Sequence, residues 1–170
     1  MEDLAYYLVL AFVAAHFVAM YSWSNLGLIL AVHGADFLGS TNMPAWALLT
    51  SIILVSSLLN LFIGSASAKW ALIAPVMVPM LMLLGISPEM ATAAYRVGDG
   101  ATNIITPLMV YFPLILIFCQ RWQSNFGLGS LAATMLPYSI GLLLSGLAMT
   151  IFWVVLDLPL GPGASVFYTL

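Results

Sequence analysis

The chain has 170 residues, of which 64% are hydrophobic and 5% are charged, and its formal net charge is −3. A soluble domain carries about 25% charged residues. This composition therefore excludes a water-soluble globular domain and predicts an integral membrane protein whose partner is the lipid bilayer. The negative net charge argues against a nucleic-acid partner, and the single cysteine, Cys119, excludes an internal disulfide.

The first predicted element covers residues 4–38. Residues 4–23 are apolar and long enough to cross a bilayer, and the polar stretch SWSNLG interrupts them. Apolar sequence then continues over residues 28–38 as a shorter helix. We therefore predict a broken helix over 4–38.

The second element, residues 44–86, consists of two apolar arms on either side of the polar stretch GSASAK at 64–69. The arms, 44–63 and 70–86, have roughly 20 and 17 residues, and each is long enough to cross a bilayer. Two interpretations stay open on length alone. GSASAK is either a loop between two full spans or the turn of a re-entrant hairpin within the membrane.

A second polar interruption lies in the predicted element 88–118. Ser87 is expected to cap this helix, Pro88 suits its first position, and Glu89 suits the positive end of its dipole. We predict a short helix over 88–97, a break at GDGATN (98–103) and a second apolar stretch to Phe118. Asp99 then lies well inside a segment of about 30 residues, where a charge costs roughly 2.5–3.5 kcal/mol.

The last predicted helix covers residues 130–156, after the polar loop QRWQSNFGLG. The apolar runs are continuous rather than alternating, which favours helices over membrane strands. The whole chain, 1–170, is therefore predicted to form a single all-α transmembrane domain.

The two polar interruptions point to a function. Irregular backbone at membrane depth persists only where it is buried in protein or lines a wet cavity, and secondary transporters place their sites there. Lys69, Arg96 and Asp99 all lie beside these interruptions. A substrate or ion pathway is the favoured interpretation, and a structural ion pair between Arg96 and Asp99, three residues apart, is the alternative. The sequence shows no nucleophile–base pairing or metal cluster, so we do not expect an enzyme.

Four stretches carry a resemblance to a known family: WSNLG, NLFIGSASAKWALIAPVMVPMLMLLGISPE, AYRVGDGATNIITPLMVYFPL and PLGPGASVFY. They resemble the p-aminobenzoyl-glutamate transporter family, AbgT, over nearly the whole chain. The resemblance corresponds only to the C-terminal half of such a transporter, because family members also contain a first hairpin and another broken helix.

This resemblance implies the C-terminal inverted-repeat half of a secondary transporter, with 44–86 as a re-entrant hairpin and 88–118 as a broken helix. It implies a multi-pass protein of the bacterial inner membrane that forms a homodimer. The missing N-terminal half is implied as a further partner. The chain would then be a fragment, the product of a split gene or a short protein that assembles with another chain.

The resemblance also implies roles for individual residues. Arg96 is implied to bind an anion, for which its planar guanidinium is suited. Gly100 departs from the family, where a serine is more usual. The implied cation site contains Asn60, Asp99 and Thr102, with Na⁺ held at Asn60 and Asp99 or a proton on Asp99 as the coupling ion, and no other cofactor. The implied substrate site contains Ser65, Ser67, Lys69, Trp70, Pro88, Arg96, Asn103 and Pro107.

The function implied is ion-coupled transport of p-aminobenzoyl-glutamate or a related small aromatic carboxylate. Efflux of sulfonamide-type drugs is also implied as a possibility for the family. The alternative is a non-functional or structural membrane fragment of a split or truncated transporter gene.

Overall fold

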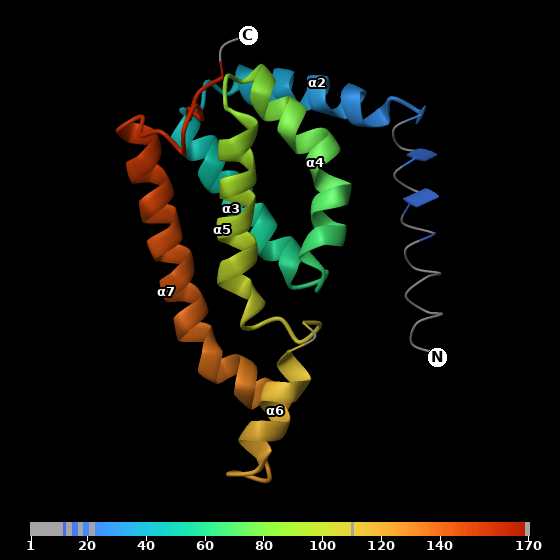
Figure 1. The fold of residues 1–170 in the computed structure, drawn as a ribbon, viewed down its shortest axis with the longest axis vertical. Coiled ribbons are helices and arrows are strands. Elements are labelled where there is room, and N and C mark those ends of the chain that lie inside the picture. Colours follow the sequence, from blue (N-terminus) through green and yellow to red (C-terminus); the bar gives the residue numbers. More distant parts are fainter. Residues whose placement is uncertain (1–11, 13–14, 17–18, 21–22, 110, 169–170) are drawn as a thin grey trace.

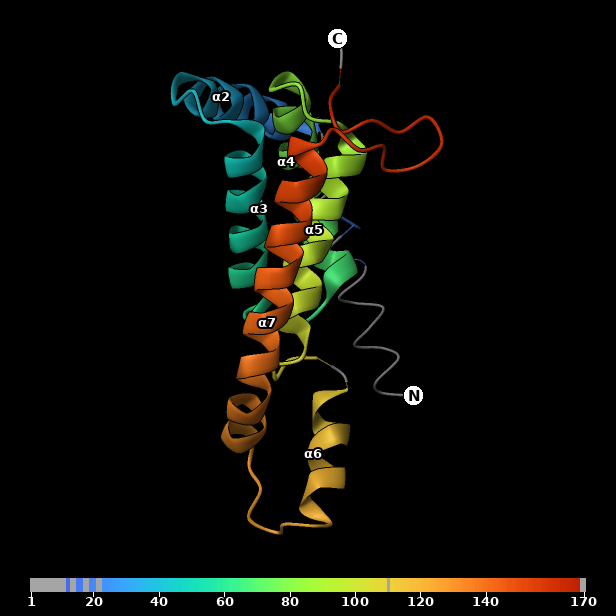
Figure 2. The same ribbon diagram turned by 90° about the vertical axis from the view of Figure 1, so that its left-hand side faces the viewer.

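The computed structural model describes residues 12, 15–16, 19–20, 23–109 and 111–168. Most of the predicted helix 4–23 lies outside these residues. In the described residues the regular secondary structure is helical, apart from isolated β-bridges. Helices α3, α4, α5 and α7 run along the long axis, α2 crosses one end of them, and α6 extends beyond the other end (Figures 1 and 2). The helices are α2 (Leu26–Ser40), α3 (Ala45–Asn60), α4 (Ala66–Leu83), α5 (Pro88–Asn103), α6 (Phe112–Gln120) and α7 (Leu128–Val155).

Helix α2 does not run parallel to the other helices. It begins after Asn25, whose φ of 54° is left-handed and turns the chain. The helix then lies across the end of α4, as Figure 1 shows. The contact is close, because a Cβ added to Gly34 would lie 2.7 Å from the Met80 sulfur.

Helices α3 and α4 form a hairpin that turns at residues 61–65. Ser65 ends the turn as the N-cap of α4, where its hydroxyl accepts a hydrogen bond of 3.3 Å from the Ala68 N–H. The 16 and 18 residues of the two helices correspond to about 24 and 27 Å. Both helices connect to the same end of the molecule, and their turn lies partway along it, while α6 continues further (Figures 1 and 2).

Helix α5 begins as its sequence predicts but ends later. Ser87 is the N-cap, with its hydroxyl accepting a 3.2 Å hydrogen bond from the Met90 N–H, and Pro88 is in the first turn. The predicted break at 98–103 is wrong, because α5 continues to Asn103 and the described non-helical stretch lies at 104–109. Proline explains the position: Pro107 has no N–H to donate and disfavours helical backbone at the residue before it.

Tight packing against α3 holds the polar part of α5 in a helix. A Cβ added to Gly98 would lie 2.3 Å from the carbonyl oxygen of Ile53, so the two backbones meet with no side chain between them. Ser56 donates a hydrogen bond of 2.9 Å to the carbonyl of Tyr95, and Ser57 donates one of 3.2 Å to that of Gly98. The apolar core lies between these helices and the end of α4, and it includes Leu48, Leu49, Ile53, Leu81, Met90, Ala91, Ala94 and Tyr95.

Helix α7 has 28 residues, about 42 Å, and packs along α3 and α5. Helices α4 and α7 are the two described helices that are long and apolar enough to cross a membrane. The segment after α7 folds back onto the α4–α5 connection. The Ser87 N–H donates to the Val166 carbonyl at 3.0 Å, and the Tyr168 N–H donates to the Gly85 carbonyl at 2.8 Å. Val166 is fully buried there.

Candidate substrate and ion site

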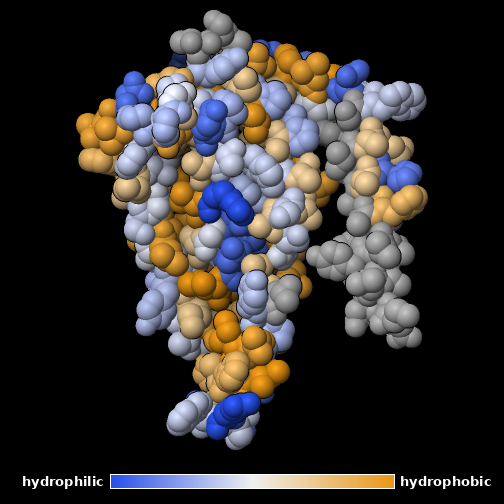
Figure 3. Space-filling view, viewed as in Figure 1, coloured by the Kyte–Doolittle hydropathy of each residue, from blue (hydrophilic) through white to orange (hydrophobic). Residues whose placement is uncertain are grey.

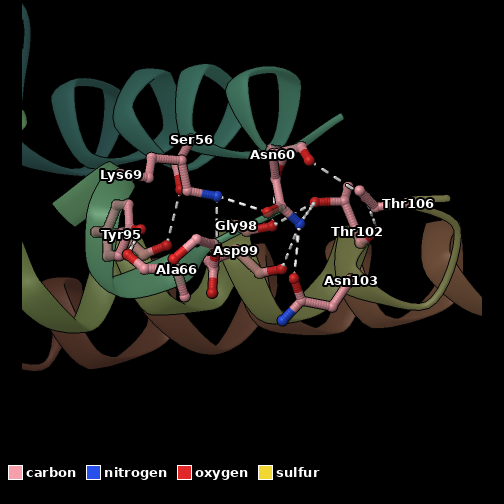
Figure 4. A network of polar contacts seen from close by, with 12 residues as sticks. Ser56, Asn60, Ala66, Lys69, Tyr95, Gly98, Asp99, Thr102, Asn103 and Thr106 are labelled. Carbon is pink, nitrogen blue, oxygen red and sulfur yellow. Dashed lines mark hydrogen bonds and ion pairs between the residues drawn. The ribbon is translucent and has the colours of Figure 1, made fainter. Parts of the chain in front are cut away.

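The lysine of the GSASAK stretch is buried in an ion pair. Lys69 Nζ lies 2.5 Å from Asp99 Oδ1, and their side chains are 0% and 2% exposed. Lys69 belongs to the first turn of α4 and Asp99 to the fourth turn of α5, so the pair joins the hairpin to α5 (Figure 4). Each charge lies where water cannot solvate it, so each depends on the other.

Asn60, the last residue of α3, completes the environment of the ammonium group. Its side-chain oxygen accepts a hydrogen bond of 2.6 Å from Lys69 Nζ. Its amide nitrogen lies 3.0 Å from the Asp99 carbonyl, 3.0 Å from Thr102 Oγ1 and 2.8 Å from Asn103 Oδ1. These three acceptors, all on α5, share the two hydrogens of the amide nitrogen and fix the amide so that its oxygen faces Lys69 (Figure 4). Three chain segments therefore meet at one buried polar centre.

Arg96 approaches the same carboxylate from the outside. Its Nη1 lies 3.6 Å from Asp99 Oδ2, and its side chain is 64% exposed. This is the i,i+3 pair that the sequence indicates. The two cations and one carboxylate carry a net charge of +1, so an anion near Arg96 would be attracted.

Arg96 lies at a pocket of about 320 Å³ between the first turn of α4 and the middle of α5. Trp70 lies beside Tyr95 with 4.6 Å between ring centroids, which provides an aromatic wall. Exposed hydrophilic residues gather over the middle and lower part of α5 on the face drawn in Figure 3. The pocket is lined by Ala66, Ser67, Trp70, Ala71, Thr92, Tyr95 and Arg96.

The structure brings together some of the residues that the sequence singles out and separates others. Asn60, Lys69, Asp99, Thr102 and Asn103 lie in the buried polar centre. Ser67, Trp70 and Arg96 line the pocket. Ser65 caps α4 in the hairpin turn. Pro107 lies in the break after α5, and Pro88 is at the opposite end of that helix, so neither lines the pocket.

Three residues of the site are missed by sequence reasoning. The Tyr95 hydroxyl donates a 2.8 Å hydrogen bond to the Ala66 carbonyl and so holds the hairpin against α5. Thr106 donates to the Asn60 carbonyl at 3.3 Å, and Ser139 of α7 donates to the Ala101 carbonyl at 2.7 Å. The spacing of Thr102 and Thr106, four apart in sequence, is the only sequence signal for any of them.

A second hollow of about 440 Å³ lies between α3 and α4, is apolar, and shares Tyr95 with the first pocket. It is bounded by α3 and α4 with Leu38 at one edge, and its walls include Ile52, Leu59, Ile73 and Met77. It contains no charged side chain, so its chemistry suits a hydrocarbon rather than an anion.

Comparisons with known proteins point to one family. The family profile of the AbgT transporters matches residues 1–168. The chain is 38% identical over 163 residues to the p-aminobenzoyl-glutamate transport protein of Escherichia coli strain K12, covering 96% of this chain and 32% of that protein.

Two solved structures are also similar. The YdaH transporter of Alcanivorax borkumensis superposes with a TM-score of 0.84 at 56% identity, covering 95% of this chain and 35% of that one. MtrF of Neisseria gonorrhoeae, described among antimetabolite efflux pumps, superposes with a TM-score of 0.79 at 48% identity, covering 96% and 33%. The chain thus spans about a third of the length of each of these relatives. With the profile matched over nearly its full length and the fold shared with two transporters, this membrane protein belongs to the AbgT transporter family.

Proposed function

We propose that this chain forms the C-terminal part of an ion-coupled secondary transporter of the bacterial inner membrane. Its substrate would be p-aminobenzoyl-glutamate or a related small aromatic carboxylate, moved in either direction across the membrane. The chain would act with an N-terminal part that supplies the first hairpin, and the complete transporter would be a homodimer.

One observation carries the proposal: Arg96 lies exposed in the pocket beside an aromatic wall, with its counter-charge Asp99 already paired to a buried lysine. Because Lys69 satisfies Asp99, the guanidinium keeps donors for another carboxylate. Trp70 would contact the aromatic ring, and Ser67 would donate a hydrogen bond. The relatives named for p-aminobenzoyl-glutamate transport and for antimetabolite efflux support this class of substrate.

The hairpin is proposed to be re-entrant. Helix α3, at about 24 Å, falls short of the ~30 Å hydrocarbon core, and α4, at about 27 Å, is near the lower limit of length for a span. Their turn lies beside the break after α5, where a Cβ on Gly64 would lie 2.4 Å from the Leu108 carbonyl. Irregular backbone inside the membrane persists only where protein or a wet cavity surrounds it, and the close approach of Leu108 to Gly64 would bury part of the turn in protein.

Transport in membrane vesicles tests the proposed function. Vesicles would contain this chain alone, the chain with the N-terminal part of a family member, or neither. We expect uptake or efflux of labelled p-aminobenzoyl-glutamate only when both parts are present, because this chain holds one hairpin of the two. If both parts insert and neither direction of transport exceeds the empty vesicles, the proposal is wrong and the chain is a non-transporting membrane fragment.

Replacing the guanidinium tests the anion site. We expect Arg96→Lys to weaken binding of p-aminobenzoyl-glutamate about tenfold or more, since a hydrogen bond to a charged group is worth about 1.5–3 kcal/mol. Equilibrium binding to the purified protein would measure the change. Arg121→Lys is the matched control, because Arg121 lies beyond α6 and stacks on Phe118 instead. Equal affinities of wild type and Arg96→Lys would remove Arg96 from the substrate site.

Cysteine labelling tests the depth of the hairpin turn, in a Cys119→Ser background. Single cysteines would replace Ser40 and Glu89 near one end of the molecule, Ser124 near the other, and Phe62 in the turn; all four are exposed. By the positive-inside rule, Arg121 predicts that the loop 120–128 faces the cytoplasm, because it is the one arginine assigned to a membrane edge.

An impermeant periplasmic reagent is therefore expected to label cysteine at 40 and 89 and to leave 124 unlabelled. A reagent confined to the cytoplasm is expected to label 124 much faster than 62. Equal cytoplasmic labelling at 62 and 124 would mean that the turn is a loop between two full spans.

A further inference from the structure

We infer that the Lys69 ammonium is a tethered cation that occupies the position of the coupling cation, so that a free monovalent cation binds Asp99 and Asn60 only when Lys69 leaves them. This inference rests on the proposed function, because it concerns the ion that the transporter would use. In this conformation Lys69 does not contact the substrate pocket, because its ammonium group faces Asp99 and Asn60.

The oxygen atoms around Lys69 Nζ are those that would bind a hard cation. They are a carboxylate oxygen of Asp99 at 2.5 Å and an amide oxygen of Asn60 at 2.6 Å. Carboxylate and carbonyl oxygens are the protein ligands that hard cations prefer. The two oxygens converge on one point, and Lys69 Nζ fills it (Figure 4).

Removing the ammonium would leave this oxygen pair in place. The Asn60 amide is oriented by Asp99, Thr102 and Asn103 through its nitrogen, independently of Lys69. Asp99 is held in α5, whose close contact with α3 at Gly98 fixes its position. The site is thus preorganised for a cation and does not depend on the lysine for its shape.

Two cations cannot share these oxygens. Positive charges about 3 Å apart in a buried site repel by several kcal/mol, even at the effective dielectric constant that suits protein sites. Lys69 also lies in the first turn of α4, where the helix dipole disfavours a positive charge. The ammonium therefore depends on Asp99, and a cation that binds Asp99 would expel it.

The pocket lies on the other side of the same turn of α4. Ser67 and Trp70 flank Lys69 in sequence and both line that pocket. An expelled ammonium would therefore be released near the anion site at Arg96. Cation binding would in this way make the pocket more positive and favour a carboxylate substrate, which is a direct route to coupling.

Lys69 is the only lysine of the chain, so its exposure can be measured on the wild-type protein. The purified chain in detergent would be treated with an amine-reactive label at fixed pH, and the modification of Lys69 would be followed by peptide mass spectrometry. Buffers would contain NaCl or choline chloride at equal ionic strength. We expect Na⁺ to raise the labelling rate about tenfold, which is a shift of ~1.4 kcal/mol in the equilibrium between paired and released lysine.

The matched control is Thr102→Ala. It keeps the ion pair and removes one of the three acceptors that orient Asn60, so a smaller Na⁺ effect is expected. A second measurement uses Lys69→Met, in which no ammonium competes. The Na⁺-specific rise in its melting temperature is expected at roughly tenfold lower Na⁺ concentration than in wild type. If Lys69→Met is monodisperse in NaCl but aggregates in choline chloride, the result also supports the inference, because Na⁺ would then replace the missing ammonium beside Asp99.

Three results would overturn the inference: a Lys69 labelling rate that is the same in NaCl and choline chloride, equal Na⁺ dependence of wild type and Lys69→Met, or a Lys69→Met chain that is aggregated in both salts. The labelling needs no substrate, so it can fail while substrate binding and transport succeed. Conversely, a chain that does not transport could still release Lys69 in Na⁺.

Discussion

Asp99→Asn is expected to lower the free energy of unfolding by about 3–5 kcal/mol, because it leaves the Lys69 ammonium buried without its carboxylate. The asparagine side chain is nearly the same size, so the loss would come from charge and not from packing. Denaturant unfolding of the purified protein in detergent measures the effect. In the presence of the N-terminal part, the same variant is also expected to lose ion-coupled transport.

Two further variants separate the ion pair from a general effect of substitution. In Lys69→Met/Asp99→Asn both charges are absent, and most of the lost stability is expected to return, since a buried pair often gives little net stabilisation. Glu89→Gln is the matched surface control, because Glu89 is exposed in the first turn of α5. If Asp99→Asn unfolded like wild type, Lys69 and Asp99 would not be a buried, mutually dependent pair.

Gly98→Ala is expected to be the other strongly destabilising change, by about 1–3 kcal/mol or more. The added methyl group would lie 2.3 Å from the Ile53 carbonyl oxygen. It would also lie 3.0 Å from the Ser56 Cβ and 3.0 Å from the Ser57 hydroxyl oxygen, and all three residues belong to α3. Helices α3 and α5 would have to separate, which would move Asn60 away from Asp99. The same unfolding measurement applies, and Lys69 should become more reactive to amine labels even without Na⁺.

Gly100→Ala is the matched control for Gly98→Ala. Gly100 lies two residues further along the same helix, and a Cβ there would meet nothing within 4 Å. Alanine is better than glycine in a helix by about 0.8–1 kcal/mol, so this variant should be neutral or stabilising. Equal behaviour of the two alanine variants would contradict the close α3–α5 packing.

The start of α5 and the all-α class of the fold can be predicted from local sequence. Serine and proline at 87–88 predict the first turn of α5, and the structure has both in those positions. The apolar composition predicts helices, and the described elements are helical. Helix capping and apolar composition depend on residues close together in the chain, so both can be recognised in the sequence without the structure.

Two features depend on contacts between distant segments and could not be predicted this way. GDGATN contains two glycines and an asparagine, which favour a break, but contact with α3 keeps it helical and Pro107 moves the break to 104–109. The partner of Lys69 lies 30 residues away on another helix. Sequence showed that Arg96 and Asp99 are close, but only the fold shows that Asp99 also pairs with Lys69.

The direct test of the central claim, that the pocket between α4 and α5 binds an aromatic carboxylate, is photoaffinity labelling. A p-azidobenzoyl-glutamate probe keeps the carboxylates and the ring of the proposed substrate, and mass spectrometry would locate its attachment to the purified protein. We expect attachment within residues 66–71 and 92–96, with unlabelled p-aminobenzoyl-glutamate competing for it. Attachment instead at the apolar hollow, on Ile52, Leu59 or Met77, would contradict the account.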